Sequence, residues 1–209
     1  MNATAHRAPV SLAIGSTRVR FIWRHDRWAH EILFPDGTAW QSLEGPVAGG
    51  GDPRWPASPV LVELSRLDRP TGAALLGVGL AGRSHFSASV GPDPVQSDCI
   101  RFEIACRVVD APPWLGSTYV GPRGIVRIAP HAAAIQPPAT LQWGYAIAPQ
   151  GLLPLGGARV DITPAAEGPH LAIAPPIDQI QAGSTRPPGT SACSTSSSGS
   201  RPTGPTSTS

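Results

Sequence analysis

Short runs of alternating apolar and polar residues fill the chain from residue 9 to about residue 175, and proline or glycine turns separate them. Alternation puts successive side chains on opposite faces, so it is typical of β-strands that bury one face. No stretch longer than about ten residues keeps a helical period without a proline or glycine break. We therefore expect an all-β fold, an antiparallel β-sandwich or barrel built from hairpins and meanders.

The clearest pattern lies near the start of the chain, where residues 18–24, 27–34 and 38–43 are expected to form three strands. His25-Asp26 and Pro35-Asp36-Gly37 supply the turns. Counting outward from these turns predicts the pairs Trp23–Trp28, Phe21–His30, Arg20–Glu31, Val19–Ile32 and Ile32–Trp40. One face then carries Val19, Phe21, Trp23, Trp28, His30, Ile32, Phe34 and Trp40, and the other carries Arg18, Arg20, Arg24, Arg27 and Glu31. The first set predicts a core that includes His30.

Further strands are expected at residues 60–64, 73–80, 84–90, 99–109, 125–128, 140–147, 158–162 and 170–174. Residues 45–58 have no period of their own. A loop of this length in a compact domain is either functional or mobile.

Composition divides the chain in two. Its 209 residues are enough for one domain, which we place at residues 9–175, and the 25 prolines and 23 glycines disfavour a helical bundle. From residue 183 to residue 209 nearly every residue is Ser, Thr, Gly or Pro. Such a segment has no apolar side chains to offset its ordering entropy, so the sequence predicts a disordered tail.

Charge and hydropathy limit the possible partners. A net charge of +2 is too small for a phosphate-binding surface, and the arginine-rich face of residues 18–31 offers no aromatic side chains for stacking, which disfavours nucleic acid. No apolar window approaches the roughly 18 residues of a membrane span, and the first residues do not resemble a secretory signal. We expect a cytoplasmic protein without a membrane partner.

Cofactor motifs are weak. The three cysteines have no zinc spacing, and the histidines and carboxylates have no metal-site spacing, so we expect no metal. Residues 77–82 match GxGxxG, but a dinucleotide site needs a helix after the glycines, and residues 83–90 alternate like a strand. We interpret the motif as a glycine-rich hairpin with Ala81-Gly82 at its tip, and expect no cofactor.

The strands at residues 84–90 and 99–109 suggest a candidate site. Arg83 and His85 fall on one face of the first strand, and Glu103 and Arg107 fall on one face of the second. If the strands are neighbours, these four side chains form a polar cluster that can bind an anion or a sugar, or perform acid–base chemistry. The alternative is the solvated face of an antiparallel sheet.

Two loop tryptophans are further candidates. Trp55 lies between Arg54 and Pro56, and Trp114 follows two prolines. A loop aromatic can stack on a sugar or contact a partner, or it can be buried as an anchor for its own loop.

No complete catalytic motif accompanies this β scaffold. We therefore expect a non-catalytic module that binds a small molecule or a protein through the polar cluster and the loop aromatics. The alternative is an enzyme for a sugar-like or other small polar substrate, with His85 and Glu103 as acid and base and the arginines orienting the substrate. A third hypothesis makes the domain a carrier for its tail.

Overall fold

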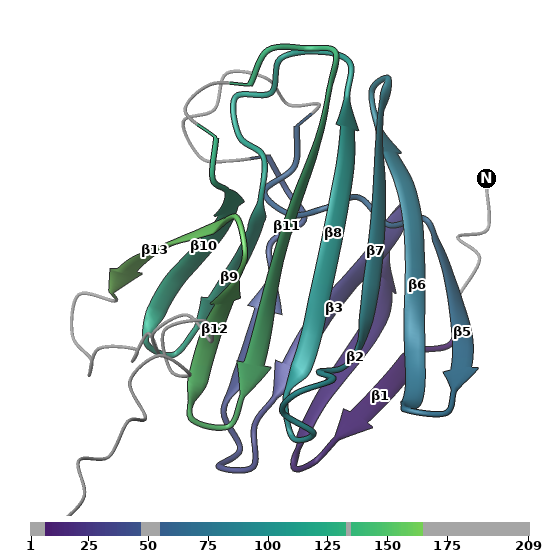
Figure 1. Cartoon of the computed structure of the whole chain (residues 1–209), viewed down its shortest axis with the longest axis vertical. Helices are drawn as coiled ribbons and strands as arrows, with labels where there is room; N and C mark the ends of the chain where they lie inside the picture. Colours follow the sequence, from purple (N-terminus) through teal and green to yellow (C-terminus); the bar gives the residue numbers. More distant parts are fainter. Residues whose placement is uncertain (1–6, 47–54, 133–134, 165–209) are drawn as a thin grey trace, which may run out of the picture.

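The structure, a computed structural model, describes residues 7–46, 55–132 and 135–164. Within these ranges the chain forms strands and no helix, and the strands make two antiparallel sheets packed face to face (Figure 1). The expected all-β fold is thus confirmed as a sandwich. The expected strand at 170–174 and the expected tail at 183–209 lie outside the described residues.

One sheet has seven strands in the order β1-β2-β3-β4-β9-β10-β13. Their bounds are β1 Val10–Ile14, β2 Thr17–Arg24, β3 Arg27–Leu33, β4 Ala39–Ser42, β9 Ser117–Gly121, β10 Gly124–Pro130 and β13 Ala158–Pro164. The other sheet has six strands in the order β12-β11-β8-β7-β6-β5. Their bounds are β5 Glu63–Arg69, β6 Gly72–Ala81, β7 Ser84–Pro92, β8 Ile100–Val108, β11 Ala139–Ala148 and β12 Gly151–Leu155.

The register of the first meander is confirmed pair by pair. The turn at His25-Asp26 joins β2 to β3, and β4 continues the meander with Trp40 opposite Ile32. Phe21, Ile32 and Trp40 are buried in the shared core, whereas Arg20 on the outer face lies 3.2 Å from Glu31. The apolar and charged faces therefore lie as the alternation predicts.

A chain of polar side chains crosses the core from one sheet to the other. His30 on β3 is buried, and its Nε2 lies 2.8 Å from the hydroxyl of Tyr119 on β9. That hydroxyl is 2.7 Å from the hydroxyl of Tyr145 on β11. Burial lowers the pKa of His30 to about 3, so the ring is neutral at pH 7, and the predicted position of His30 in the core is confirmed.

The strand expected at 60–64 is wrong in its position, because β5 begins only at Glu63. Residues 60–62 instead pass between the two sheets. The Leu61 carbonyl accepts a hydrogen bond from the Trp28 amide at 2.7 Å, and the Val62 amide donates to the Val78 carbonyl at 2.8 Å. Residues 60–62 are apolar, which made them resemble the start of a strand. β5 itself is an exposed edge strand with polar side chains on both faces, so its sequence does not alternate.

The glycine-rich hairpin is confirmed, with its tip displaced by one residue. β6 and β7 pair from Ala81–Ser84 onward, which leaves Gly82 and Arg83 as the turn, with Gly82 at a φ of 57°. Left-handed backbone of this kind favours glycine. Arg83 therefore belongs to the turn and not to the face of β7.

Candidate functional site

The outer face of the six-stranded sheet presents three successive rows of side chains across its strands. The registers of β6, β7, β8, β11 and β12 align Leu80, His85, Arg107 and Thr140 in the first row. The second row is Val78, Ser87, Ala105 and Gln142, and the third is Leu76, Ser89, Glu103, Gly144 and Leu155. Along β6, β7 and β8 these residues alternate with buried ones, so their side chains leave the sheet on the solvent side.

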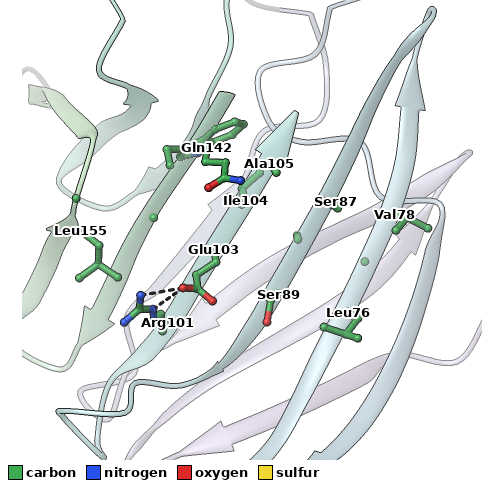
Figure 2. A pocket seen from close by; sticks show the side chains of 15 residues that line it. Leu76, Val78, Ser87, Ser89, Arg101, Glu103, Ile104, Ala105, Gln142 and Leu155 are labelled. Carbon is green, nitrogen blue, oxygen red and sulfur yellow. Dashed lines mark hydrogen bonds and ion pairs between the residues drawn. The ribbon is translucent and has the colours of Figure 1, made fainter. Parts of the chain in front are cut away.

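The rows enclose a trough, the name we give to the hollow over β7 and β8. Its floor carries small residues, Ser87, Ser89 and Ala105, while Leu76 and Val78 stand on one side and Gln142 and Leu155 on the other (Figure 2). One part measures about 700 Å³ and a second, toward His85, about 490 Å³. Val78, Ser87 and Ala105 line both parts, so the two are continuous.

The β6 wall of the trough is aliphatic. Leu76, Val78 and Leu80 are 37, 46 and 52 % exposed, although their side chains are large and apolar. They follow one another at alternate positions of a single strand. A contiguous apolar stripe of this kind on a protein surface often marks a binding site.

One end of the trough holds a fixed ion-pair cluster. The Arg101 guanidinium donates to Glu103 Oε1 from Nη2 at 2.8 Å and from Nε at 3.1 Å, as the dashed lines in Figure 2 show. Its Nη1 lies 3.5 Å from Oδ2 of Asp93, a carboxylate with a fully buried side chain. Asp93 also accepts hydrogen bonds from the amides of Val95 and Gln96, so the turn after β7 positions Arg101.

The structure brings together only part of the predicted polar cluster. His85 and Arg107 are direct cross-strand neighbours, whereas Glu103 lies opposite Ser89, two rows away. At about 3.3 Å per residue this puts roughly 13 Å along the strand between the His85 and Glu103 positions. All three line the trough, but His85 and Glu103 are not placed to exchange a proton directly.

Arg83 lies apart from the trough. It pairs with the carboxylate of Asp110 at the hairpin end of the sheet, where the Arg83 side chain is 73 % exposed. Arg83 was expected on the same face of β7 as His85. It instead lies in the hairpin turn before β7, so it is on neither face of that strand.

The two loop tryptophans anchor their own segments. Trp55 is 3 % exposed and packs in the core, with its ring centroid 6.4 Å from that of Phe86. Trp114 is half-buried, and its Nε1 donates to the Ala57 carbonyl at 3.0 Å. Neither residue lines the trough.

Sequence reasoning did not identify the aliphatic wall or Gln142 and Leu155. The signal for the wall was present in the hairpin, since a turn at residues 82–83 places Leu80 opposite His85. For Gln142 and Leu155 no local signal exists, because β11 and β12 reach the sheet from a distant part of the chain.

A second hollow, of about 570 Å³, lies at the turn between β2 and β3 and is lined by Arg24, Arg27 and Glu44, among others. Glu44 Oε1 accepts a hydrogen bond from Ser42 Oγ at 2.5 Å, but Glu44 Oε2 is buried and has no partner among the described residues. Burial raises the pKa of this carboxyl to about 7. Because Oε2 is buried and Oε1 is bonded to Ser42, neither carboxyl oxygen of Glu44 is free to bind a ligand in the hollow.

Metal and membrane features can be assessed within the described ranges. There, no three His, Cys, Asp or Glu side chains gather closely enough to hold a metal ion. The same part of the chain contains no helix with the length and apolarity needed to cross a membrane.

Comparison with known proteins finds no matching family model, no matching curated protein and no matching solved structure.

Proposed function

We propose that this domain is a non-catalytic binding module that holds an elongated ligand along the trough. One observation carries the proposal: Ser87, Ala105 and Ser89 form a floor of small side chains, while larger side chains stand on both sides and at both ends. Hollows of this size, largely apolar and with a few polar groups, are characteristic of binding sites.

The positions of the polar groups support binding over catalysis. General acid–base catalysis needs groups within about 3 Å of the protons they transfer. His85 and Glu103 lie two rows apart, and the Glu103 carboxylate is engaged with Arg101. His85 and Glu103 therefore cannot pass a proton to each other, and Glu103 already has a partner, which favours binding.

We also propose a cytoplasmic location. The support is chemical: Cys99 and Cys106 are free and buried, and burial raises the pKa of each thiol to about 12. Unpaired thiols fit a reducing compartment. Fractionation of cells that express the protein tests this, and recovery from an oxidising compartment would reject it.

The binding proposal is tested by blocking the trough. The full chain and a Ser87→Trp variant are screened against a phage library of random 12-residue peptides and against a printed glycan array. Ser87 is exposed on the trough floor, so a tryptophan fills the hollow without entering the core. We expect the full chain to retain ligands that the variant loses.

The matched control is Ser11→Trp, which puts the same side chain on an exposed strand position of the other sheet. Gln142→Trp, at another exposed trough position, repeats the test if Ser87→Trp fails to fold by circular dichroism. Ligands that bind every variant equally, or no ligand at all, would reject the proposal.

A further inference from the structure

We propose that the ligand of the trough is an extended polypeptide segment with aliphatic side chains at alternate positions and a carboxylate at the end next to His85 and Arg107. This inference rests on the proposed function, since it names the chemistry of the ligand at the same site.

The aliphatic wall sets the first requirement. Leu76, Val78 and Leu80 recur every second residue of β6, and each is more than a third exposed. An extended peptide repeats its side chains on one side with the same period, about 6.7 Å. A segment lying along the trough can therefore contact each of these three side chains with one of its own, and remove all three from water.

The trough floor suits a polypeptide backbone. Ser87, Ser89 and Ala105 are small, so a chain can approach the sheet closely between the β6 wall and Gln142. The serine hydroxyls and the Gln142 amide can donate to backbone carbonyls of the bound segment.

The charged side chains of the trough indicate which end of the bound peptide carries a carboxylate. At the far end of the trough, Glu103 of the third row pairs with Arg101, two residues earlier on β8, and their charges offset each other at 2.8 Å. In the first row, Arg107 is exposed beside His85, and among the described residues it forms no ion pair. The Glu63 carboxylate, opposite Val78 on β5, lines the same part of the trough but forms no ion pair with Arg107 among the described residues. The Arg107 guanidinium can therefore bind a carboxylate of the ligand through two parallel hydrogen bonds.

Aromatic side chains distinguish a peptide from a glycan or a single-stranded nucleic acid. Sugars and bases are commonly held by stacking on exposed rings. Within the described part of the chain, the three rows contain no Phe, Trp or Tyr, and the neighbouring Phe86 and Trp143 are 4 and 2 % exposed. The trough therefore offers aliphatic and charged contacts in place of a stacking platform.

The test uses the peptides that bind the full chain but not the Ser87→Trp variant. We expect these sequences to be enriched in Val, Ile and Leu at alternate positions and in Asp or Glu near one end. For one such acidic peptide, Arg107→Glu should weaken binding about tenfold or more, measured by fluorescence anisotropy. Selection on Arg107→Glu should favour Lys and Arg in place of acidic residues.

The matched control is Arg18→Glu, a charge reversal at an exposed strand position of the other sheet, which should leave the affinity unchanged. Arg107→Ala, with an expected smaller loss, replaces Arg107→Glu if that variant does not fold. Trough-dependent peptides without acidic preference, or trough-dependent glycans, would overturn this inference and leave the binding module standing. Absence of any trough-dependent ligand would overturn the module itself.

Discussion

Glu44, which has a buried carboxyl oxygen, and the buried His30 have pKa values that shift in opposite directions. Burial raises the pKa of Glu44 from 4.5 to about 7 and lowers that of His30 from 6.5 to about 3. Both shifts favour the neutral form, since the interior penalises charge. The Ser42 side chain links their surroundings, because Ser42 Oγ accepts from the His30 amide and donates to Glu44.

The two residues contribute to stability in different pH ranges. The Glu44 contribution is fully present below the unfolded pKa of 4.5 and is lost as pH rises through about 7. The His30 contribution is fully present above 6.5 and is lost as pH falls toward about 3. Between pH 4.5 and 6.5 the two slopes oppose each other, so together they predict a plateau of stability there.

We expect Glu44→Gln to increase stability at pH 8 by on the order of 2 kcal/mol, and to change it little at pH 5. Glutamine is neutral at both pH values. The Glu44 carboxyl is neutral at pH 5 and is charged at pH 8. Urea unfolding at the two pH values measures the difference. Glu63→Gln, at an exposed position on β5, is the control and should follow the parent chain. If Glu44→Gln and the parent chain differ in unfolding free energy by the same amount at pH 5 and at pH 8, the raised pKa of Glu44 is contradicted.

At the scale of the element, β6 is a strand whose glycines are required by a neighbouring segment. Residues 60–62 pass so close to it that a Cβ on Gly79 would lie 2.3 Å from the Val60 carbonyl oxygen, and a Cβ on Gly77 would lie 3.0 Å from the Leu61 side chain. The first two glycines of the GxGxxG motif therefore reflect close packing on the inner face of the strand, and the third, Gly82, serves the hairpin turn. Leu76, Val78 and Leu80 consequently occupy the outer face.

Replacing Gly79 by alanine should destabilise the domain by about 1–3 kcal/mol, because the new methyl group meets backbone that cannot rotate away. Thermal unfolding measures the loss. Gly156→Ala is the matched control, since no atom lies within 4 Å of its added Cβ, and it should leave the midpoint within a few degrees. Equal midpoints for the two variants would show that residues 60–62 can move away from β6.

Local pattern predicted two of the hairpins and missed others. The pairs of β2 with β3 and of β6 with β7 follow from counting outward from a two-residue turn. β1 and β9, each one strand of a hairpin, were not recognised. β12 was also missed, because it contains Pro154, which an edge strand tolerates although it lacks an amide hydrogen.

The candidate site was predicted in part for a similar reason. Alternation correctly placed His85, Glu103 and Arg107 on one face. Their spacing depended on the connection between β7 and β8, where Asp93 accepts hydrogen bonds from two amides and forms an irregular turn. No periodicity reveals the offset that such a turn introduces, so the two-row separation of His85 and Glu103 could not be counted from the sequence.

At the scale of the whole molecule, both sheets share one core. Phe21, Ile32 and Tyr119 from the seven-stranded sheet pack in the same buried cluster as Phe102 and Tyr145 from the six-stranded sheet. The ring of Phe102 stacks on that of His30 at 5.5 Å and on that of Tyr145 at 4.9 Å. Neither sheet has a separate core of similar size within the described residues.

We therefore expect a single cooperative unfolding transition. Tryptophan fluorescence reports on the core, since Trp28, Trp40 and Trp143 are 5, 4 and 2 % exposed, while far-ultraviolet circular dichroism reports on the strands. The two signals should have the same midpoint in urea. Repeating the experiment with a thiol reductant excludes cross-linking through cysteine as a cause of any difference. Two separate midpoints would show that the sheets unfold independently.

The strand order also has a consequence for biosynthesis. Strands β1 to β4 leave the ribosome first, yet their inner face packs against the later strands β6, β7 and β8. The edge of β4 also pairs with the later strand β9, through Gln41–Val120 and Ser42–Tyr119. Until those strands are made, the nascent chain exposes Phe21, Ile32 and Trp40 together with an unpaired strand edge. Such intermediates are prone to aggregation. The yield of this protein in cells should therefore depend on translation rate and on chaperones that shield the first meander.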